Sequence, residues 1–225
     1  MTITIATTSQ ATKLDKSGRA QREFAGGLGT LAKKMQDAGT LVTTMPTGST
    51  YGTGYLVYYT FAPANAGAAL VHASITQPTS GTTTVTTGFS AITFPRLVSV
   101  TGNQATCTGN LVLTGTDIEG VVISDTLVIN GTATVNSVKS FKTISQAVVP
   151  TRGAASDAIT IGTVNTFGLP IRLSNTAQVI AGSFYGTVDT GFTVSVDATD
   201  ISKNLYVTAG TPNGTKILWI AMMGM

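Results

Sequence analysis

Near its middle the chain reads Val121-Val-Ile-Ser-Asp-Thr-Leu-Val-Ile-Asn-Gly-Thr-Ala-Thr-Val135, and this stretch indicates the fold most clearly. Val, Ile and Thr are branched at Cβ and fit a pleated strand better than a helix. Asn-Gly between two such runs is a preferred pair for a type I′ hairpin turn. The stretch therefore predicts a β-hairpin that turns at Asn130-Gly131. A second Asn-Gly pair, Asn213-Gly214, leads into the last predicted strand.

The composition of the whole chain extends this prediction. Thr occurs 42 times in 225 residues, and only 10% of the residues are charged, against about 25% in an average soluble domain. A chain rich in Thr and Val and interrupted by Gly favours an all-β protein. The low charge also favours a subunit of a permanent assembly, because a lone soluble protein usually keeps more surface charge to resist association.

Strand patterns alternate with turn signals from residue 40 to the end of the chain. Many short strands separated in this way predict a β-sandwich, of the jelly-roll or immunoglobulin-like type, over residues 41–225. We expect the strand over 132–149 to be bent or bulged. The predicted strands cover 40–45, 54–61, 68–76, 82–87, 90–100, 105–114, 121–129, 132–149, 159–164, 177–188, 191–197, 204–208 and 215–223.

Residues 1–40 hold the whole excess of positive charge. They carry six basic and three acidic side chains, whereas residues 41–225 carry seven of each. Leu28, Leu31 and Met35 recur at helical spacing, and Gly39 is well placed to end a helix. We therefore predict a basic, extended N-terminal arm over residues 1–40 that contains one short helix. The alternative, an ordinary helix packed on the domain, stays open.

Few residues suit catalysis or metal binding. His72 and Cys107 are the only residues of their types, so one chain cannot supply an ordinary zinc site. No nucleophile-elbow or phosphate-loop sequence accompanies them. We therefore expect a protein that is not an enzyme and that binds no cofactor or metal. The carboxylate pairs that a glycosidase would use lie in two predicted solvated turns: Asp117 with Glu119, and Asp197 with Asp200.

Aromatic residues are concentrated between positions 51 and 61. Strand alternation places Tyr55, Tyr59 and Phe61 on one face of the predicted strand and Tyr58 on the other. A platform for carbohydrate is one interpretation, because tyrosine offers an apolar ring and a hydroxyl. We favour packing in the core or at a subunit interface. The candidate interface residues are Tyr55, Tyr58, Tyr59 and Phe61.

Several segments in the second half of the chain resemble segments of tailed-bacteriophage virion proteins. They are Pro95-Arg96, Thr114-Gly-Thr-Asp-Ile-Glu-Gly120, Ser124-Asp-Thr-Leu-Val-Ile-Asn-Gly131, Lys139-Ser-Phe-Lys-Thr-Ile144, Gly168-Leu-Pro170 and Thr211-Pro-Asn-Gly-Thr215. The resemblance covers residues 88–225, consists of strand and turn patterns, and does not extend to residues 1–87. It implies a β-sandwich head protein of the decoration (cement) or head-fibre kind, which sits on the assembled capsid.

The resemblance and the composition together lead to one functional hypothesis, a decoration protein that binds the outside of an assembled phage capsid and stabilises it. Its expected partners are the major capsid protein and copies of itself, as a trimer. Its expected location is the virion surface, after synthesis in the host cytoplasm. An extended arm can contact several neighbouring subunits at once. The arm residues expected at capsid or subunit contacts are Arg19, Arg22, Leu28, Leu31, Lys33, Lys34 and Met35.

The alternative function is a tail or fibre component that binds host carbohydrate, and the aromatic residues at 51–61 support it. We expect no nucleic-acid binding, because the excess charge of residues 1–40 is small and no basic face with interleaved aromatic residues accompanies it. We expect no membrane insertion, because the apolar run 217–223 is too short to span a bilayer. Both faces of that run are apolar, so we predict that the last strand is covered on both sides.

Overall fold

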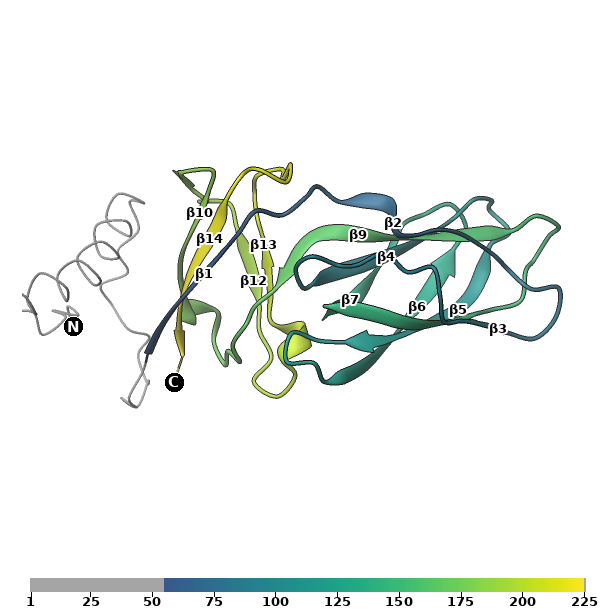
Figure 1. Cartoon of the computed structure of the whole chain (residues 1–225), viewed down its shortest axis with the longest axis horizontal. Helices are drawn as coiled ribbons and strands as arrows, with labels where there is room; N and C mark the ends of the chain where they lie inside the picture. The colour runs from purple at the N-terminus through teal and green to yellow at the C-terminus, as the bar shows by residue number, and fades with distance from the viewer. Residues whose placement is uncertain (1–54, 225) are drawn as a thin grey trace, which may run out of the picture.

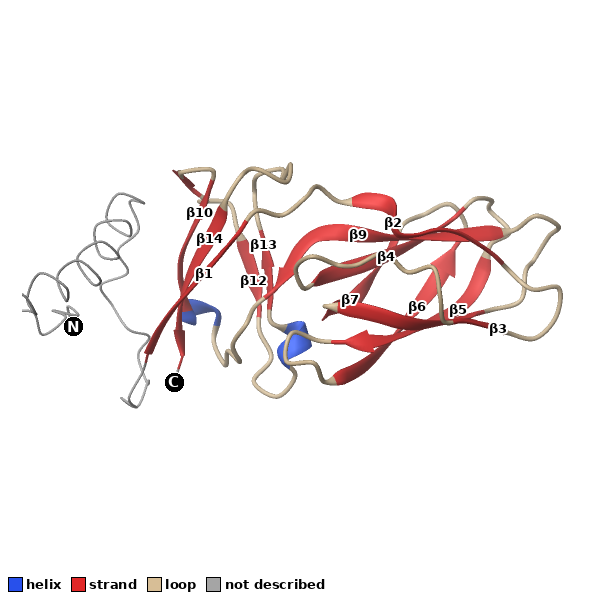
Figure 2. Cartoon of the chain, in the orientation of Figure 1, coloured by secondary structure: helices blue, strands red, loops and turns tan. Residues whose placement is uncertain are grey.

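The computed structural model of the protein describes residues 55–224, which consist mainly of β-strands (Figure 1). The only helical segments in this part, η3 (Thr176–Gln178) and η4 (Ile201–Lys203), are single 3-10 turns, drawn in blue in Figure 2. The predicted all-β, sandwich-like fold is confirmed. The predicted arm over 1–40, its helix and the strand over 40–45 lie outside the described residues.

The strands form three antiparallel sheets, which we call terminal, central and distal. Figure 1 shows the terminal sheet at one end of an elongated molecule and the distal sheet in its other half. The strands are β1 (Tyr55–Phe61), β2 (Gly67–Thr76), β3 (Thr83–Val85), β4 (Arg96–Gly102), β5 (Thr108–Thr116), β6 (Val122–Asn130), β7 (Val135–Phe141), β8 (Thr143–Val149), β9 (Ala158–Gly168), β10 (Val179–Phe184), β11 (Thr187–Val188), β12 (Thr193–Ser195), β13 (Leu205–Val207) and β14 (Leu218–Gly224).

Strand order in the sheets differs from strand order in the chain. The terminal sheet has the order β1-β14-β10-β11, and the distal sheet has the order β3-β8-β5-β6. The six-stranded central sheet has the order β12-β13-β9-β4-β7, with β2 also pairing with β9. Because β1 pairs with β14, the first and last described strands lie side by side.

The buried hydrophobic residues form two clusters. The first cluster contains residues of the central and distal sheets, among them Val98, Leu113 and Ile159. The second contains residues of the terminal sheet and of the central-sheet strands β9 and β13, among them Phe167 and Ile220. Strand β9 contributes Ile159 to the first cluster and Phe167 to the second. This strand therefore links the two cores.

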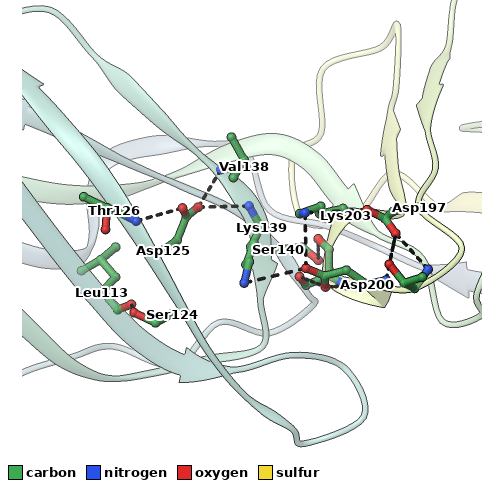
Figure 3. Close-up of polar contacts among 12 residues, drawn as sticks. Leu113, Ser124, Asp125, Thr126, Val138, Lys139, Ser140, Asp197, Asp200 and Lys203 are labelled. Carbon is green, nitrogen blue, oxygen red and sulfur yellow. Dashed lines mark hydrogen bonds and ion pairs between the residues drawn. The ribbon is translucent and has the colours of Figure 1, made fainter.

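The predicted hairpin at Asn130-Gly131 is wrong. β6 pairs with β5 and β7 pairs with β4, so the Asn-Gly corner joins the distal sheet to the central sheet. Gly131 has a φ of 56°, but Asn130 does not adopt a positive φ, and a type I′ turn requires both. The Asp125 carboxylate accepts the backbone N–H groups of Val138 at 2.7 Å and Lys139 at 3.1 Å (Figure 3). A side chain of β6 thus satisfies two β7 donors that a paired strand would otherwise satisfy.

The predicted long strand over 132–149 is two strands. β7 ends at Phe141 and β8 begins at Thr143, so the chain passes from the central to the distal sheet at Lys142. The backbone N–H of Lys142 donates to the Thr116 carbonyl at 2.7 Å, which fixes this corner against the end of β5. The bend predicted from the sequence is therefore a change of sheet.

The loop between β8 and β9 is organised by Asp157, which is fully buried. Its carboxylate accepts the Thr106 hydroxyl at 2.7 Å and the backbone N–H groups of Gly153 at 2.9 Å and Ala154 at 2.8 Å. The Thr106 hydroxyl, together with these backbone donors, lowers the pKa of Asp157 in spite of its burial. The charged carboxylate therefore stabilises the fold above its unfolded-state pKa of about 3.9, and this stabilisation is lost as the pH falls through the lower folded-state pKa.

We expect Asp157→Asn to lower the free energy of unfolding at pH 7, because an amide cannot accept hydrogen bonds from all three donors. The difference from the wild type should shrink once the pH falls below about 4, because Asp157 of the unfolded wild type then takes up a proton while the folded carboxylate stays charged, and it should level off below the lower folded-state pKa. Urea denaturation of both proteins at pH 7 and at about pH 3 measures this difference. A difference of the same size at both pH values would show that the charge of Asp157 does not stabilise the loop.

Candidate interaction surface

The outer face of the terminal sheet is uncharged, and it is exposed along β1, whereas Ala181, Ser183 and Ala221 on the same face are buried. None of the strands β1, β10, β11 and β14 contains a charged residue. Their inner face packs in the second core, whereas Leu56 is 40% and Tyr58 37% exposed on the outer side. The strand registers place on this outer face Leu56, Tyr58, Thr60, Ala181, Ser183, Trp219, Ala221 and Met223.

Two stacked aromatic rings lie on this outer face. Tyr58 stacks on Trp219 with ring centroids 5.5 Å apart and an angle of 30° between the ring planes. Trp219 is half-buried and is the only tryptophan of the chain. Ile217 and Tyr185, at the end of the face, are 52% and 68% exposed. Aromatic and aliphatic side chains gathered on an uncharged surface are typical of interface centres.

The four candidate interface aromatics fall on two sides of β1. Tyr58 lies on the outer face, and the predicted alternation along the strand is confirmed. Phe61 is buried in the second core, with its ring centroid 4.8 Å from that of Phe94 and 4.6 Å from that of Tyr59. Burial also raises the pKa of Tyr59. Phe61 is therefore a core residue, and the partly buried Tyr59 packs against the same core. Tyr55 opens β1 opposite Gly224.

The last strand is covered on one side among the described residues. Leu218, Ile220 and Met222 are fully buried in the second core. On the opposite side Ala221 is fully buried, whereas Trp219 and Met223 are only half-buried. Sequence reasoning missed both as surface residues, because strand alternation separates two faces without showing which one meets the core. A cover for the second face stays a prediction.

The candidate arm contacts cannot be placed on this surface. All of them lie outside the described residues, which begin at β1. They are Arg19, Arg22, Leu28, Leu31, Lys33, Lys34 and Met35.

A second cluster, of charged residues, ties the loop between β12 and β13 to β7 (Figure 3). The Asp200 carboxylate lies 3.7 Å from the Lys139 ammonium and 3.7 Å from that of Lys203, which is also 3.7 Å from Asp197. Partial burial would raise the pKa of Asp200, but hydrogen bonds from Ser202 and the Lys139 charge lower it overall. Each carboxylate thus has cationic and hydrogen-bonding partners, and the predicted solvated turn is instead a structural contact between loop and strand.

Asp197 has the most strongly perturbed carboxyl of this cluster. The Thr199 hydroxyl and the backbone N–H groups of Thr199 and Asp200 donate to it at 2.7, 2.8 and 3.0 Å. The Thr199 hydroxyl, followed by these backbone donors, holds the pKa of Asp197 far below its usual range. A carboxylate held so firmly in its charged form is a poor general acid.

The other predicted solvated turn, between β5 and β6, is also partly buried. Asp117 is 4% exposed, and its carboxylate accepts the backbone N–H groups of Glu119 and Val121, each at 2.9 Å. Glu119 is exposed and pairs with Arg172 at 2.9 Å. Asp117 therefore shapes the turn, and only Glu119 meets the predicted solvated description.

The remaining polar candidates do not converge on a site. His72 packs against Phe89, with ring centroids 5.5 Å apart, and Cys107 is fully buried in the first core. Among residues 55–224, no three His, Cys, Asp or Glu residues are grouped so that they could hold a metal ion. In the same part of the chain, no helix has the length and apolar character needed to cross a membrane. The outer face of the terminal sheet is therefore the strongest candidate site.

Comparisons of the chain with family models, with curated proteins and with solved structures found no match. The resemblance of residues 88–225 to phage virion proteins consequently stays a prediction. A functional proposal has to be built from the chemistry of the outer face.

Proposed function

We propose that this protein is a structural subunit of a tailed-phage particle that binds the outside of the assembled capsid as a decoration protein. The observation that carries the proposal is the uncharged outer face of the terminal sheet, on which Tyr58 of the edge strand β1 stacks on Trp219 of β14. The all-β fold and the sequence resemblance of residues 88–225 give further support. The proposed partners are the major capsid protein and copies of the chain itself, as a trimer on the virion surface.

The outer face has the properties of a docking surface. Burying apolar surface stabilises a complex by about 25 cal/mol per Å², and large aromatic anchors contribute most of the affinity of many interfaces. The polypeptide preceding Tyr55 joins the terminal sheet at its edge strand β1. We propose that the basic residues of the arm contact the same partner as the outer face. Contacts made together by two linked segments bind more tightly than either does alone.

The double variant Leu56→Lys with Tyr58→Lys tests the role of the outer face. Both side chains are well exposed, so the fold should persist, whereas two buried ammonium groups would oppose docking. The matched control is Val122→Lys with Val128→Lys on β6, where the valines are 72% and 60% exposed. We expect the first variant to bind undecorated capsids at least about tenfold more weakly than the wild type, and the control to bind normally.

The assay is co-sedimentation of the purified protein with capsids that lack it, and circular dichroism checks that every variant is folded. Equal binding by the two double variants would exclude the outer face as the docking surface. Failure of the wild-type protein to bind any capsid would overturn the decoration proposal as a whole.

The tail or fibre alternative is favoured by one observation, the stacked pair of Tyr58 and Trp219. Such a pair offers sugar rings an apolar platform next to a tyrosine hydroxyl. Because Trp219 is the only tryptophan, its fluorescence reports directly on any ligand that covers it. A saturable change in emission on titration with host surface glycans would support this alternative, whereas no change is expected of a decoration protein.

A further inference from the structure

The free edge of β1 is a site for strand addition. β1 is the end strand of the terminal sheet and pairs with β14 on one side. On its other side no strand lies among residues 55–224. The pairing with β14 runs without a bulge from Tyr55–Gly224 to Phe61–Leu218. An edge with this regularity presents its backbone N–H and C=O groups in register for a further strand.

β1 also lacks the features that normally protect an edge. Proteins block strand addition with charged side chains, proline, bulges or very short edge strands. β1 has seven residues, Tyr-Leu-Val-Tyr-Tyr-Thr-Phe, and none of them is charged or proline. The other sheet edges do carry such features. β3 and β12 have three residues each and β11 has two, whereas the longer end strands β6 and β7 contain Asp125 and Lys139, and β2 pairs with β9 through register shifts. Among the described strands, β1 is therefore a long sheet edge without these protections.

We propose that residues 40–45 of the same chain pair antiparallel with this edge and form a fifth strand of the terminal sheet. Their sequence, Thr-Leu-Val-Thr-Thr-Met, has the β-branched composition of a strand. The connection to β1, residues 46–54, reads Pro-Thr-Gly-Ser-Thr-Tyr-Gly-Thr-Gly and is rich in turn-forming residues. Strands that follow each other in sequence are neighbours in about two-thirds of cases.

We propose the register in which the chain reverses direction at residues 46–54, so that residues 40–45 run antiparallel to β1. Directly opposed residues of antiparallel strands share a face. Pairing Thr44 with Leu56 and Val42 with Tyr58 places Val42 and Thr44 on the outer face. Leu41, Thr43 and Met45 then share the inner face with the core residues of β1. The proposal concerns the edge alone and does not depend on capsid binding.

The disulfide pair Thr44→Cys with Leu56→Cys tests this register. Opposed residues have Cβ atoms about 4.5–5.5 Å apart, close enough to cross-link with a small adjustment. The mismatched control is Thr44→Cys with Thr60→Cys, because Thr60 lies on the same face but about 13 Å further along β1. The native Cys107 is fully buried and should not compete. We expect mild oxidation to give an intrachain disulfide in the test pair and none in the control.

Non-reducing electrophoresis and mass spectrometry of peptides distinguish the outcomes. A second pair, Val42→Cys with Tyr58→Cys, should cross-link within the chain as well, which protects the test against a local distortion at one position. Cross-links between chains would show that a neighbouring copy occupies the edge, and this would overturn the proposal. Absence of a cross-link in both pairs, or equal cross-linking of the control, would overturn it too.

Discussion

Replacing Arg96 with alanine should lower the free energy of unfolding by roughly 2–4 kcal/mol, because hydrogen bonds to a charged group contribute about 1.5–3 kcal/mol each and part of this is recovered where the acceptors reach water. Arg96 is 6% exposed at the start of β4. Its guanidinium donates to the Val164 carbonyl at 2.8 Å, the Ala64 carbonyl at 3.0 Å and the Asn165 side-chain oxygen at 2.8 Å. It also lies over the Phe167 ring, 4.9 Å from the ring centroid. Arg96 thus fastens the β1–β2 connection to β9 where β9 enters the second core.

The size of this effect follows from burial. Burial lowers the pKa of Arg96 to about 10, so the group stays cationic at neutral pH. Among residues 55–224 it has no carboxylate partner, and its charge is met by carbonyl oxygens and by the Phe167 ring. Alanine would remove a donor from the Val164 and Ala64 carbonyls, at about 1–3 kcal/mol for each acceptor that stays buried. The Asn165 oxygen would keep the Ala66 N–H as its donor.

Arg172→Ala is the matched control for Arg96→Ala. Arg172 also donates to a carbonyl, that of Thr199 at 2.8 Å, and pairs with Glu119, but its side chain is half exposed. Its loss should change the free energy of unfolding by about 0–1 kcal/mol. Urea denaturation measures the free energy of unfolding of both variants. A decrease for Arg96→Ala no larger than that for Arg172→Ala would show that the buried contacts of Arg96 do not stabilise the fold.

Gly182→Ala should destabilise the protein by about 3 kcal/mol, at the upper end of the usual range for overpacking. A Cβ atom at this position would clash with the Tyr206 hydroxyl oxygen and would lie 2.9 Å from Cζ of the same ring. Tyr206 is fully buried, and its hydroxyl donates to the Asp189 carboxylate at 2.8 Å. Burial, and then the adjacent Asp189 charge, raise the pKa of Tyr206 well above its usual range, so the hydroxyl keeps its proton. The terminal sheet therefore approaches β13 as closely as a glycine permits.

A double-mutant cycle tests this contact more sharply than either single variant. Tyr206→Phe alone should cost about 1–3 kcal/mol, because Asp189 loses a donor in a buried site. In the double variant the oxygen that clashes with the new Cβ is gone, so the loss should be smaller than the sum of the two single losses. Additive losses in urea denaturation would show that the clash lies elsewhere.

The sequence predicted strands well and strand pairing poorly. The alternation between Tyr58 and its neighbours was readable, because side-chain direction along a strand depends only on the chain itself. The hairpin at Asn130-Gly131 was predicted wrongly, because the turn preference of two residues gave way to packing between the central and distal sheets. The pairing of β1 with β14 joins residues far apart in sequence, and no local pattern encodes it.

The candidate surface could be predicted only in part, for the same reason. Tyr58 was singled out from the sequence, whereas Trp219 and Met223 join it only through the pairing of β1 with β14. The carboxylates Asp117 and Asp157 look like ordinary loop residues in the sequence. Their burial depends on backbone donors that the folded turns bring together.

Electron cryomicroscopy of undecorated phage capsids incubated with the purified full-length protein tests the central claim most directly. The proposal predicts added density on the outside of the capsid, with the terminal sheet toward the capsid and the distal sheet away from it. The outer-face residues Leu56, Tyr58 and Trp219 should then lie against capsid protein or a neighbouring copy. A capsid without added density, or a bound subunit whose terminal sheet points into solvent, would contradict the account.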